Sequence, residues 1–496
     1  MAREKALYTN RRGFILQGAA AWAAFLSGRA FAAAPGSFDG VNRRLRVGVL
    51  SDTHISVFDP GAQDEIGGYN AKTFIRALRW FDEQKVDAVV ISGDLTNHAF
   101  EEEFMAVGDA WRTVFPGGKG ADGRKVQKLF ICGNHDWEGW KYGRFGVKKC
   151  PDAAELKRRI FTYNREDFWR KAFDEDFTEY PSIEVNGYMF VGAHWPHHKN
   201  PGAAQAIEAC AAKAGGKPFF FLQHPHVRGS VFGGAEASEE DAGATLAKYP
   251  NAVAISGHSH LSITDERSIW QGAYTAVNAG CLRYIALPSG RENSGPKRNS
   301  AFKAMPYNKV FDCRQGMLMD VYGDRIVFAR REFVTGEPLG PDWVVPLAGE
   351  RPMRYAPRAA ASKPPKFPSD AKVKVSPPAP GKTRDGKDVE QVTIEFPQTL
   401  PSAAGRDRVF DYRVELKIAY GRDMVWETNA VRRFMADGFC QPEGRMPKTM
   451  RCVMNATEIP RETNLLFEVR AANCFGVMSK PLVSDVIRFK GVVVKW

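Results

Sequence analysis

Apolar and polar positions follow two patterns along the first half of the chain. Runs of consecutive apolar side chains predict buried strands, and apolar residues that recur every three to four positions predict amphipathic helices. The strand-like runs are 45–51, 88–92, 126–132, 219–223 and 252–256. The helical period is clear at Phe74, Ala77, Leu78 and Phe81, and again at Phe104, Val107 and Trp111. This alternation predicts an α/β domain of layered sheets and helices, which we place at 43–350.

The end of that domain and the segment after it have different compositions. Two extended runs within 316–332 flank the turn Tyr322-Gly323-Asp324 and predict a closing hairpin. Residues 351–388 hold eight prolines among many lysines and arginines. This composition predicts an exposed, semi-rigid linker.

The C-terminal part is predicted to be all-β. Strand-sized runs at 389–396, 411–420, 465–471 and 483–489 are separated by turn residues, and no convincing helical period occurs among them. A small β-sandwich at 370–496 follows, with its strands starting at 389. Segment 464–476, followed by Ser479-Lys480-Pro481, resembles the last hairpin of a fibronectin type III module.

Composition excludes several classes of protein. The chain has 496 residues, 44% hydrophobic and 25% charged, which excludes collagen-like, wholly disordered and polytopic membrane proteins. Its formal charge of +12 is spread along the chain and is not gathered in one basic arm. The charge therefore gives no specific indication of nucleic-acid binding.

The first 32 residues resemble a twin-arginine export signal. Arg11 and Arg12 stand directly before an apolar run from Phe14 to Leu26, and Ala30-Phe31-Ala32 supplies a small-x-small cleavage pattern. The apolar run is shorter than the roughly 20 residues that a membrane span needs. We therefore expect an exported protein in the periplasm or outside the cell. The alternative is a frayed helix at the start of a cytosolic domain.

The eight cysteines contain no Cys-x-x-Cys pair, so they predict neither a zinc ribbon nor a dense disulfide framework. Cys440 and Cys452 flank a segment with Pro and Gly. They are either bridged in an oxidising compartment or buried as free thiols.

The strongest chemical pattern lies at the ends of the predicted strands. All ten histidines fall between positions 54 and 260. In order, the strand ends carry Asp52-Thr53-His54, Gly93-Asp94, Gly133-Asn134-His135-Asp136, His224-Pro225 and Gly257-His258-Ser259-His260. Ligands bind at the carboxyl ends of strands in α/β sheets, because loops converge there.

These residue types indicate metal. Carboxylates, an amide and imidazoles without a thiolate suit Mn, Fe, Zn or Co and suit Cu(I) poorly. One ion would not use so many donors. We expect Asp94 to bridge two divalent ions through its two oxygens. His258 and His260, two residues apart in extended chain, would each reach a different ion. Two such ions lower the pKa of a bridging water and make hydroxide available as a nucleophile.

The five motifs resemble, in order, the five blocks of the calcineurin-like metallophosphoesterase family, whose fold is a double sheet of mixed strands flanked by helices. The resemblance implies that Asp52, His54, Asp94 and His260 hold one ion, and that Asp94, Asn134, His224 and His258 hold the other. It also implies that His135 faces the substrate as an acid or a donor to the transition state, with Asp136 orienting its ring.

Three nearby positions qualify this interpretation. His226 stands two residues after His224 and is the alternative ligand, but His224 directly ends the apolar run 219–223. Cys281 stands where the family often has Ser, and we expect a packed small residue there and not a nucleophile. Asn97 replaces the Tyr of purple acid phosphatases, which disfavours that subfamily.

The sequence therefore predicts an exported, dinuclear metal-dependent phosphoesterase acting on a phosphate mono-, di- or pyrophosphoester. The competing hypothesis is a cell-envelope binding protein that uses the β-sandwich on glycan or protein and keeps an inactive phosphoesterase scaffold. A missing metal ligand would favour that hypothesis, and none is missing. Substrate choice depends on the rim segments 137–165 and 194–205, which carry no specificity motif. Metal identity and oligomeric state stay open as well.

Overall fold

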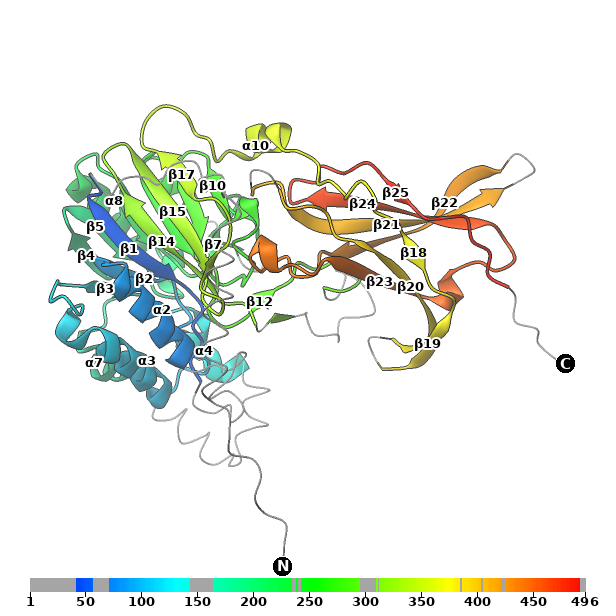
Figure 1. Ribbon diagram of the computed structural model, residues 1–496. Coiled ribbons are helices and arrows are strands. Elements are labelled where there is room, and N and C mark those ends of the chain that lie inside the picture. The colour runs from blue at the N-terminus through cyan, green and yellow to red at the C-terminus, as the bar shows by residue number, and fades with distance from the viewer. Residues whose placement is uncertain are drawn as a thin grey trace, which may run out of the picture. The chain divides into compact units, whose positions relative to one another are not determined.

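The computed structural model describes residues 42–56, 71–142, 164–233, 238–239, 242–294, 309–310, 312–383, 386–402, 405–420 and 424–490. The fold below is that of the compact unit Arg43–Trp496 (Figure 1). The predicted export signal at 1–32, Cys150 and much of the rim segment 137–165 lie outside the described residues.

The N-terminal part of this unit is built around two large sheets of mixed parallel and antiparallel strands. The first has the order β16-β15-β14-β1-β2-β3, with β17 also paired to β15. Its strands are β1 (Leu45–Leu50), β2 (Ala88–Ile91), β3 (Gln127–Phe130), β14 (Gln315–Val321), β15 (Arg325–Glu332), β16 (Glu337–Pro338) and β17 (Trp343–Pro346). The second has the order β10-β11-β9-β6-β5-β4. Its strands are β4 (Ser182–Val185), β5 (Tyr188–Gly192), β6 (Phe219–Leu222), β9 (Ala252–Ser256), β10 (Ile269–Gln271) and β11 (Thr275–Asn278).

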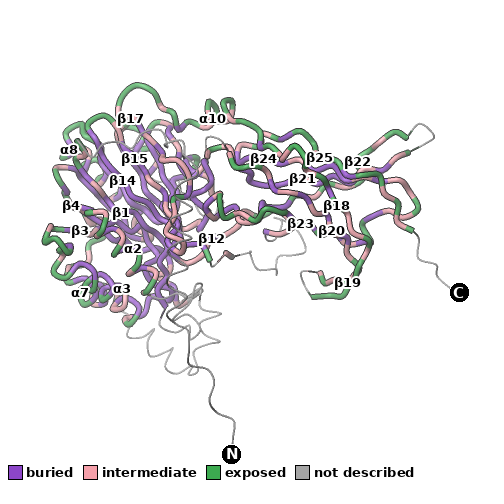
Figure 2. Tube along the Cα trace, viewed as in Figure 1, coloured by how far each residue is buried: buried purple, intermediate pink, exposed green. Residues whose placement is uncertain are grey.

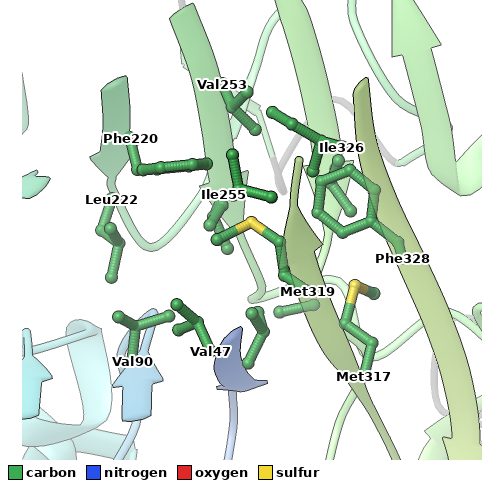
Figure 3. Close-up of a cluster of buried hydrophobic side chains, with 14 of the residues drawn as sticks. Val47, Val90, Phe220, Leu222, Val253, Ile255, Met317, Met319, Ile326 and Phe328 are labelled. Atoms are coloured by element: carbon green, nitrogen blue, oxygen red, sulfur yellow. The ribbon is translucent and has the colours of Figure 1, made fainter. Parts of the chain in front are cut away.

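The two sheets share a hydrophobic core. Val47 and Val90 of the first sheet, together with Met319 of its closing hairpin, meet Phe220 and Ile255 of the second (Figure 3). All five side chains are fully buried. Strands β1, β2 and β3 pair in parallel, as do β5, β6, β9 and β11. A buried parallel sheet needs apolar side chains on both faces, which explains the unbroken apolar runs.

Helices cover the outer faces of both sheets. Helices α2 (Ala71–Glu83), α3 (Glu101–Val114) and α7 (Arg165–Phe173) pack on the first sheet. Helix α8 (Pro201–Ala214) packs on the second. The predicted apolar positions of α2 are the ones it buries, Phe74, Ala77, Leu78 and Phe81. The predicted α/β double sheet flanked by helices is therefore confirmed, as are its five strands and its closing hairpin.

The C-terminal part consists of two four-stranded antiparallel sheets. One contains β18 (Lys374–Val375), β19 (Ala379–Lys382), β20 (Asp388–Pro397) and β23 (Thr449–Asn455). The other contains β21 (Val409–Tyr420), β22 (Val425–Met435), β24 (Leu465–Asn473) and β25 (Leu482–Val483). Buried residues from both sheets form one core (Figure 2). The all-β character is confirmed, while the likeness to fibronectin type III stays a prediction.

The structure differs from the sequence analysis in the placement of several β-elements. Strands β18 and β19 lie inside the expected linker 351–388 and pair with β20, and a short helix, α10 (Tyr355–Ala361), precedes them. Strand β22 was missed because most of its side chains are exposed or half-buried and give no apolar alternation. Strand β25 ends at Val483, well short of the expected 489.

The two parts meet through buried contacts. Cys281, Ile285 and Cys313 pack against Cys440 of the C-terminal part. Arg291 forms an ion pair with the fully buried Asp411, with Nε 2.8 Å from Oδ2. These contacts join the two parts into one compact unit. Cys440 and Cys452 are both free, buried thiols, so the bridged alternative is wrong in this structure.

Among the described residues, no helix combines the length and the apolar character that a membrane crossing requires.

Candidate metal centre

Seven predicted ligands lie at the carboxyl ends of strands from both sheets. They are Asp52 and His54 after β1, Asp94 after β2, Asn134 after β3, His224 after β6, and His258 and His260 after β9. All are buried except His258, which is half-buried. The loops that follow parallel strands are the usual place for a ligand site in an α/β sheet, and here both sheets contribute.

The backbone is left-handed at five of these ligands. The angle φ is 53° at Asp52, 43° at His54, 53° at Asp94, 67° at His258 and 52° at His260. For residues other than glycine, such conformations cost about 1–3 kcal/mol each and gather at functional sites. The sequence analysis placed His258 and His260 in extended chain. That expectation is wrong, because both residues have a left-handed backbone. The sharp turns at these residues direct the side chains inward.

One group of donors consists of Asp52, His54, Asp94 and His260. The Nε2 atoms of His54 and His260 lie 3.1 Å apart. Asp52 Oδ1 lies 3.1 Å from His260 Nε2, and Asp94 Oδ2 lies 3.3 Å from His54 Nε2. Four electron-rich atoms therefore face one another in a buried space.

The second group consists of Asp94, His224 and His258. His224 Nε2 lies 3.1 Å from Asp94 Oδ2 and 3.1 Å from His258 Nδ1. Asp94 thus belongs to both groups, and the same oxygen, Oδ2, faces both. Its other oxygen accepts a hydrogen bond of 2.8 Å from the backbone N–H of His135. Asp94 would therefore present Oδ2 to both ions, whereas the sequence analysis expected each oxygen to reach a different ion.

Asn134 adds a neutral oxygen next to the second group. Its Oδ1 is buried and accepts no hydrogen bond from the described residues. The preceding residue, Gly133, packs so closely that a Cβ there would collide with Asp94 Oδ1 and would lie 2.7 Å from His224 Cδ2. Gly257 has the same role beside Ser51 and Asp52. Glycine at these two positions lets the ligand loops meet.

The donor set fits divalent cations. Metal–nitrogen bonds of about 2.0–2.1 Å place neighbouring ligand atoms roughly 3 Å apart, close to the separations seen here. Asp52 Oδ1 is buried and accepts no hydrogen bond from the described part of the chain, and unsatisfied carboxylate oxygens inside a protein are costly. A cation in each group would satisfy these atoms.

Comparison with known proteins agrees with this geometry. Residues 45–262 match the model of the family described as calcineurin-like phosphoesterase. These residues form a calcineurin-like phosphoesterase domain. The donor set and the family together make the protein a metal-dependent hydrolase of phosphoric esters. No curated protein sequence matches the chain.

Several solved structures share part of the architecture. A dimetal phosphatase from Danio rerio is 12% identical over 62% of this chain and 100% of its own, with a TM-score of 0.36. A conserved uncharacterized protein from Streptococcus pneumoniae, titled a predicted phosphoesterase, is 13% identical over 61% and 97%, with a TM-score of 0.25. Vacuolar Protein Sorting 29 from Cryptosporidium parvum is 11% identical over 62% and 100%, with a TM-score of 0.27. Likenesses this weak establish neither fold nor function.

His135 and Asp136 have different contacts from those expected in the phosphoesterase domain. The backbone carbonyl of Asn97 lies 2.8 Å from His135 Nδ1 and orients the ring. The Asp136 carboxylate instead accepts hydrogen bonds from the backbone N–H groups of Leu95, Thr96 and Gly133, at 2.7–3.0 Å. Asp136 thus joins the loop after β2 to the loop after β3. These bonds position the loop that carries Asp94, while the expected role of Asp136 in orienting His135 stays a prediction.

The choice of His224 over His226 is supported by the geometry. His226 is buried, and its two ring nitrogens contact Ser256 Oγ at 2.7 Å and Ser259 Oγ at 2.8 Å. It therefore braces the turn between His258 and His260. Cys281 Sγ lies 3.2 Å from His260 Nδ1, behind the ligand and not in front of the donor atoms. This position agrees with a packed residue and not with a nucleophile.

Sequence reasoning missed Arg283. Its Nη1 lies 3.2 Å from His54 Nδ1, and its charge lowers the pKa of both His54 and His135 after the larger effect of burial. Arginine has no acceptor, so this contact requires a lone pair on Nδ1. A His54 that binds metal through Nε2 carries its proton on Nδ1 and can no longer accept from Arg283. Arg283 follows Cys281 by two positions, and no sequence motif distinguishes it from other arginines.

The metal-free ligands hold protons that a cation must displace. Burial lowers the pKa of His224, but Asp94 and Asp52 outweigh it and raise that pKa to about 9. Burial and the neighbouring His224 lower the pKa of His258 to about 4. At pH 7 the pair therefore carries one extra proton, and with it one positive charge, on His224.

We expect Co²⁺ binding at pH 7 to release this proton, because metal-ligating imidazoles must be neutral. Since the pKa of His224 is raised, the apparent Co²⁺ affinity should rise with pH from 7 toward 9. The measurement is calorimetry in buffers of different ionisation enthalpy. Uptake of Co²⁺ without proton release would contradict the assigned protonation.

We also expect substitutions of Asp94 and of His135 to differ in their effects on metal content and on turnover. Asp94→Asn removes the charge shared by both groups and should lose metal and activity together. His135→Ala should retain metal while turnover falls by about 10²–10⁴-fold, the usual contribution of a positioned proton donor. Elemental analysis and steady-state kinetics test both variants. Full activity in Asp94→Asn would disprove a shared ligand, and metal loss in His135→Ala would make His135 a ligand.

Proposed function

We propose that the protein is an exported, dinuclear phosphoesterase that hydrolyses a phosphate mono-, di- or pyrophosphoester. The observation that carries this proposal is the position of Asp94 Oδ2, which is 3.3 Å from His54 Nε2 and 3.1 Å from His224 Nε2. One oxygen shared by two groups of donors supports two neighbouring ions. Mn, Fe, Zn and Co all suit these ligands.

When bound, the ions supply Lewis acidity and activate water as a nucleophile. The chain's own residues hold the ions and orient the phosphate. Burial lowers the pKa of His135 to about 4, so the free ring is neutral at pH 7. With Nδ1 directed at the Asn97 carbonyl, Nε2 has a lone pair. His135 can donate from Nε2 only after gaining a second proton, which a bound phosphate anion would favour.

Arg283 is the proposed phosphate anchor of the site. If His54 held a metal through Nε2, its Nδ1 would carry a proton and could not accept from Arg283, which would leave that guanidinium donor for the substrate. The effect of its charge on His135 places it near the residue expected to face the substrate. A guanidinium offers a planar fork of donors that matches phosphoryl oxygens.

The competing hypothesis, a binding protein with an inactive scaffold, has less support because all seven proposed ligands are present and six of them meet in the two donor groups. Glycan or envelope contact stays a proposal for the C-terminal sheets. Their exposed apolar side chains include Val425, Val453 and Val483.

Metal analysis of the full chain and a panel of mono-, di- and pyrophosphoesters test the proposed activity. In the same panel, Arg283→Gln should raise KM and weaken inhibition by inorganic phosphate by about 10–100-fold, the effect of losing a hydrogen bond to a charged group. Arg283→Lys should recover part of this loss, because it keeps the charge. Co²⁺ content should not fall in either variant. Unchanged phosphate affinity in Arg283→Gln would remove Arg283 from the substrate site.

Export has its own test. Arg11→Lys combined with Arg12→Lys should trap the precursor inside the cell, because the proposed signal depends on paired arginines. Cell fractionation followed by immunoblotting measures this. Normal export of the double variant would rule out the twin-arginine assignment.

A further inference from the structure

We propose that the C-terminal sheets complete the metal centre: the backbone carbonyls of Phe439 and Cys440 hold the segment that carries His258 and His260, and Gln315 is a positioning residue between them. The proposal rests on the proposed function insofar as it requires metal at these histidines.

The segment 261–264, directly after His260, is held at several points. The side chain of Asn278 donates to the Leu261 carbonyl at 3.1 Å, and Arg330 Nη1 donates to the Ile263 carbonyl at 2.8 Å. The Ile263 N–H donates to Gln315 Oε1 at 2.8 Å. Thr264 Oγ1 donates to the carbonyl of Phe439 at 3.0 Å. The last bond comes from the C-terminal part of the chain.

Gln315 links this segment to the same C-terminal turn. It is fully buried, and its Nε2 donates to the carbonyl of Cys440 at 2.6 Å. Its backbone N–H donates to the carbonyl of Cys281 at 2.8 Å, and Cys281 Sγ lies 3.2 Å from His260 Nδ1. Gln315 therefore reaches His260 by two routes, one through Ile263 and one through Cys281.

The C-terminal turn is itself anchored. Phe439 and Cys440 are each 2% exposed and follow β22. The end of β22 is fixed by a hydrogen bond of 2.7 Å from the Met435 N–H to Asn293 Oδ1. The two carbonyls are therefore placed independently of Gln315.

Removing these carbonyls would leave Gln315 Nε2 and Thr264 Oγ1 to share Ser262 Oγ, which lies 2.9 Å from the first and 2.7 Å from the second. One hydroxyl cannot replace two carbonyls, and each buried donor left unsatisfied costs about 1–3 kcal/mol, so the segment would rearrange. Because His260 lies only three residues before Ile263, its ring would shift with the segment. Groups that orient metal ligands typically change metal affinity by about 10–100-fold when they are lost.

The test is Co²⁺ binding to the full chain. Calorimetry measures the affinity, and the visible absorption of the bound ion reports its ligand geometry. Gln315→Leu should weaken Co²⁺ binding at least about tenfold and alter the spectrum. The matched control is Gln271→Leu. Gln271 is also buried, and its Oε1 accepts from the backbone N–H of Met353, away from the ligand loops. This control should keep the affinity and the spectrum.

A second pair of variants decides the question if Gln315→Leu does not fold. Thr264→Val removes the hydroxyl that reaches Phe439 and should weaken Co²⁺ binding, whereas Thr264→Ser keeps the hydroxyl and should retain it. Wild-type affinity and spectrum in both Gln315→Leu and Thr264→Val would overturn the proposal. If the wild-type chain binds no Co²⁺, the metal centre itself is disproved, and that outcome is distinct from a failure of the brace.

Discussion

The site brings electron-rich atoms so close together that they would repel one another without positive charge between them. Asp94 Oδ2 lies within 3.3 Å of imidazole nitrogens from two different loops, and two further nitrogen pairs face each other at 3.1 Å. In a buried space such donors repel one another unless protons or cations lie between them. The rest of the phosphoesterase domain is arranged to keep them there.

Rigidity of the scaffold comes from the core between the two sheets. Its fully buried strands end where the ligands begin, so each ligand follows immediately after a well-packed strand. Left-handed backbone at five ligands costs free energy that the ligand loops cannot recover locally. The burial of apolar strands and the hydrogen bonds of Asp136 to three backbone N–H groups offset that cost. The buried carboxylate of Asp136 thereby holds the loop after β2 against the loop after β3.

The sequence predicted what depends on local pattern and on motif order. Apolar runs and helical periods located the strands and helices, because burial imposes those periods directly. The ligands were found because carboxylates and imidazoles at successive strand ends have few structural explanations. Arg283 was missed because its contact with His54 joins residues 229 positions apart. The partner of His135 was missed because Asn97 acts through its backbone carbonyl, which every residue has. Strand β22 has a solvated face and therefore no apolar alternation.

Positive charges of the chain itself lie beside both donor groups, and they link metal binding to the proposed catalysis. Without metal, a proton on His224 and the guanidinium of Arg283 stand close to the donor groups and reduce the repulsion among them. Each is incompatible with a cation on the same imidazole, since His224 needs its lone pair and His54 needs its Nδ1 proton. Metal binding would therefore displace protons from both groups, because the pKa of His260 is also raised well above its usual value despite its burial. Arg283 lies beside the same pocket, so its charge would then be available for the phosphate proposed as substrate.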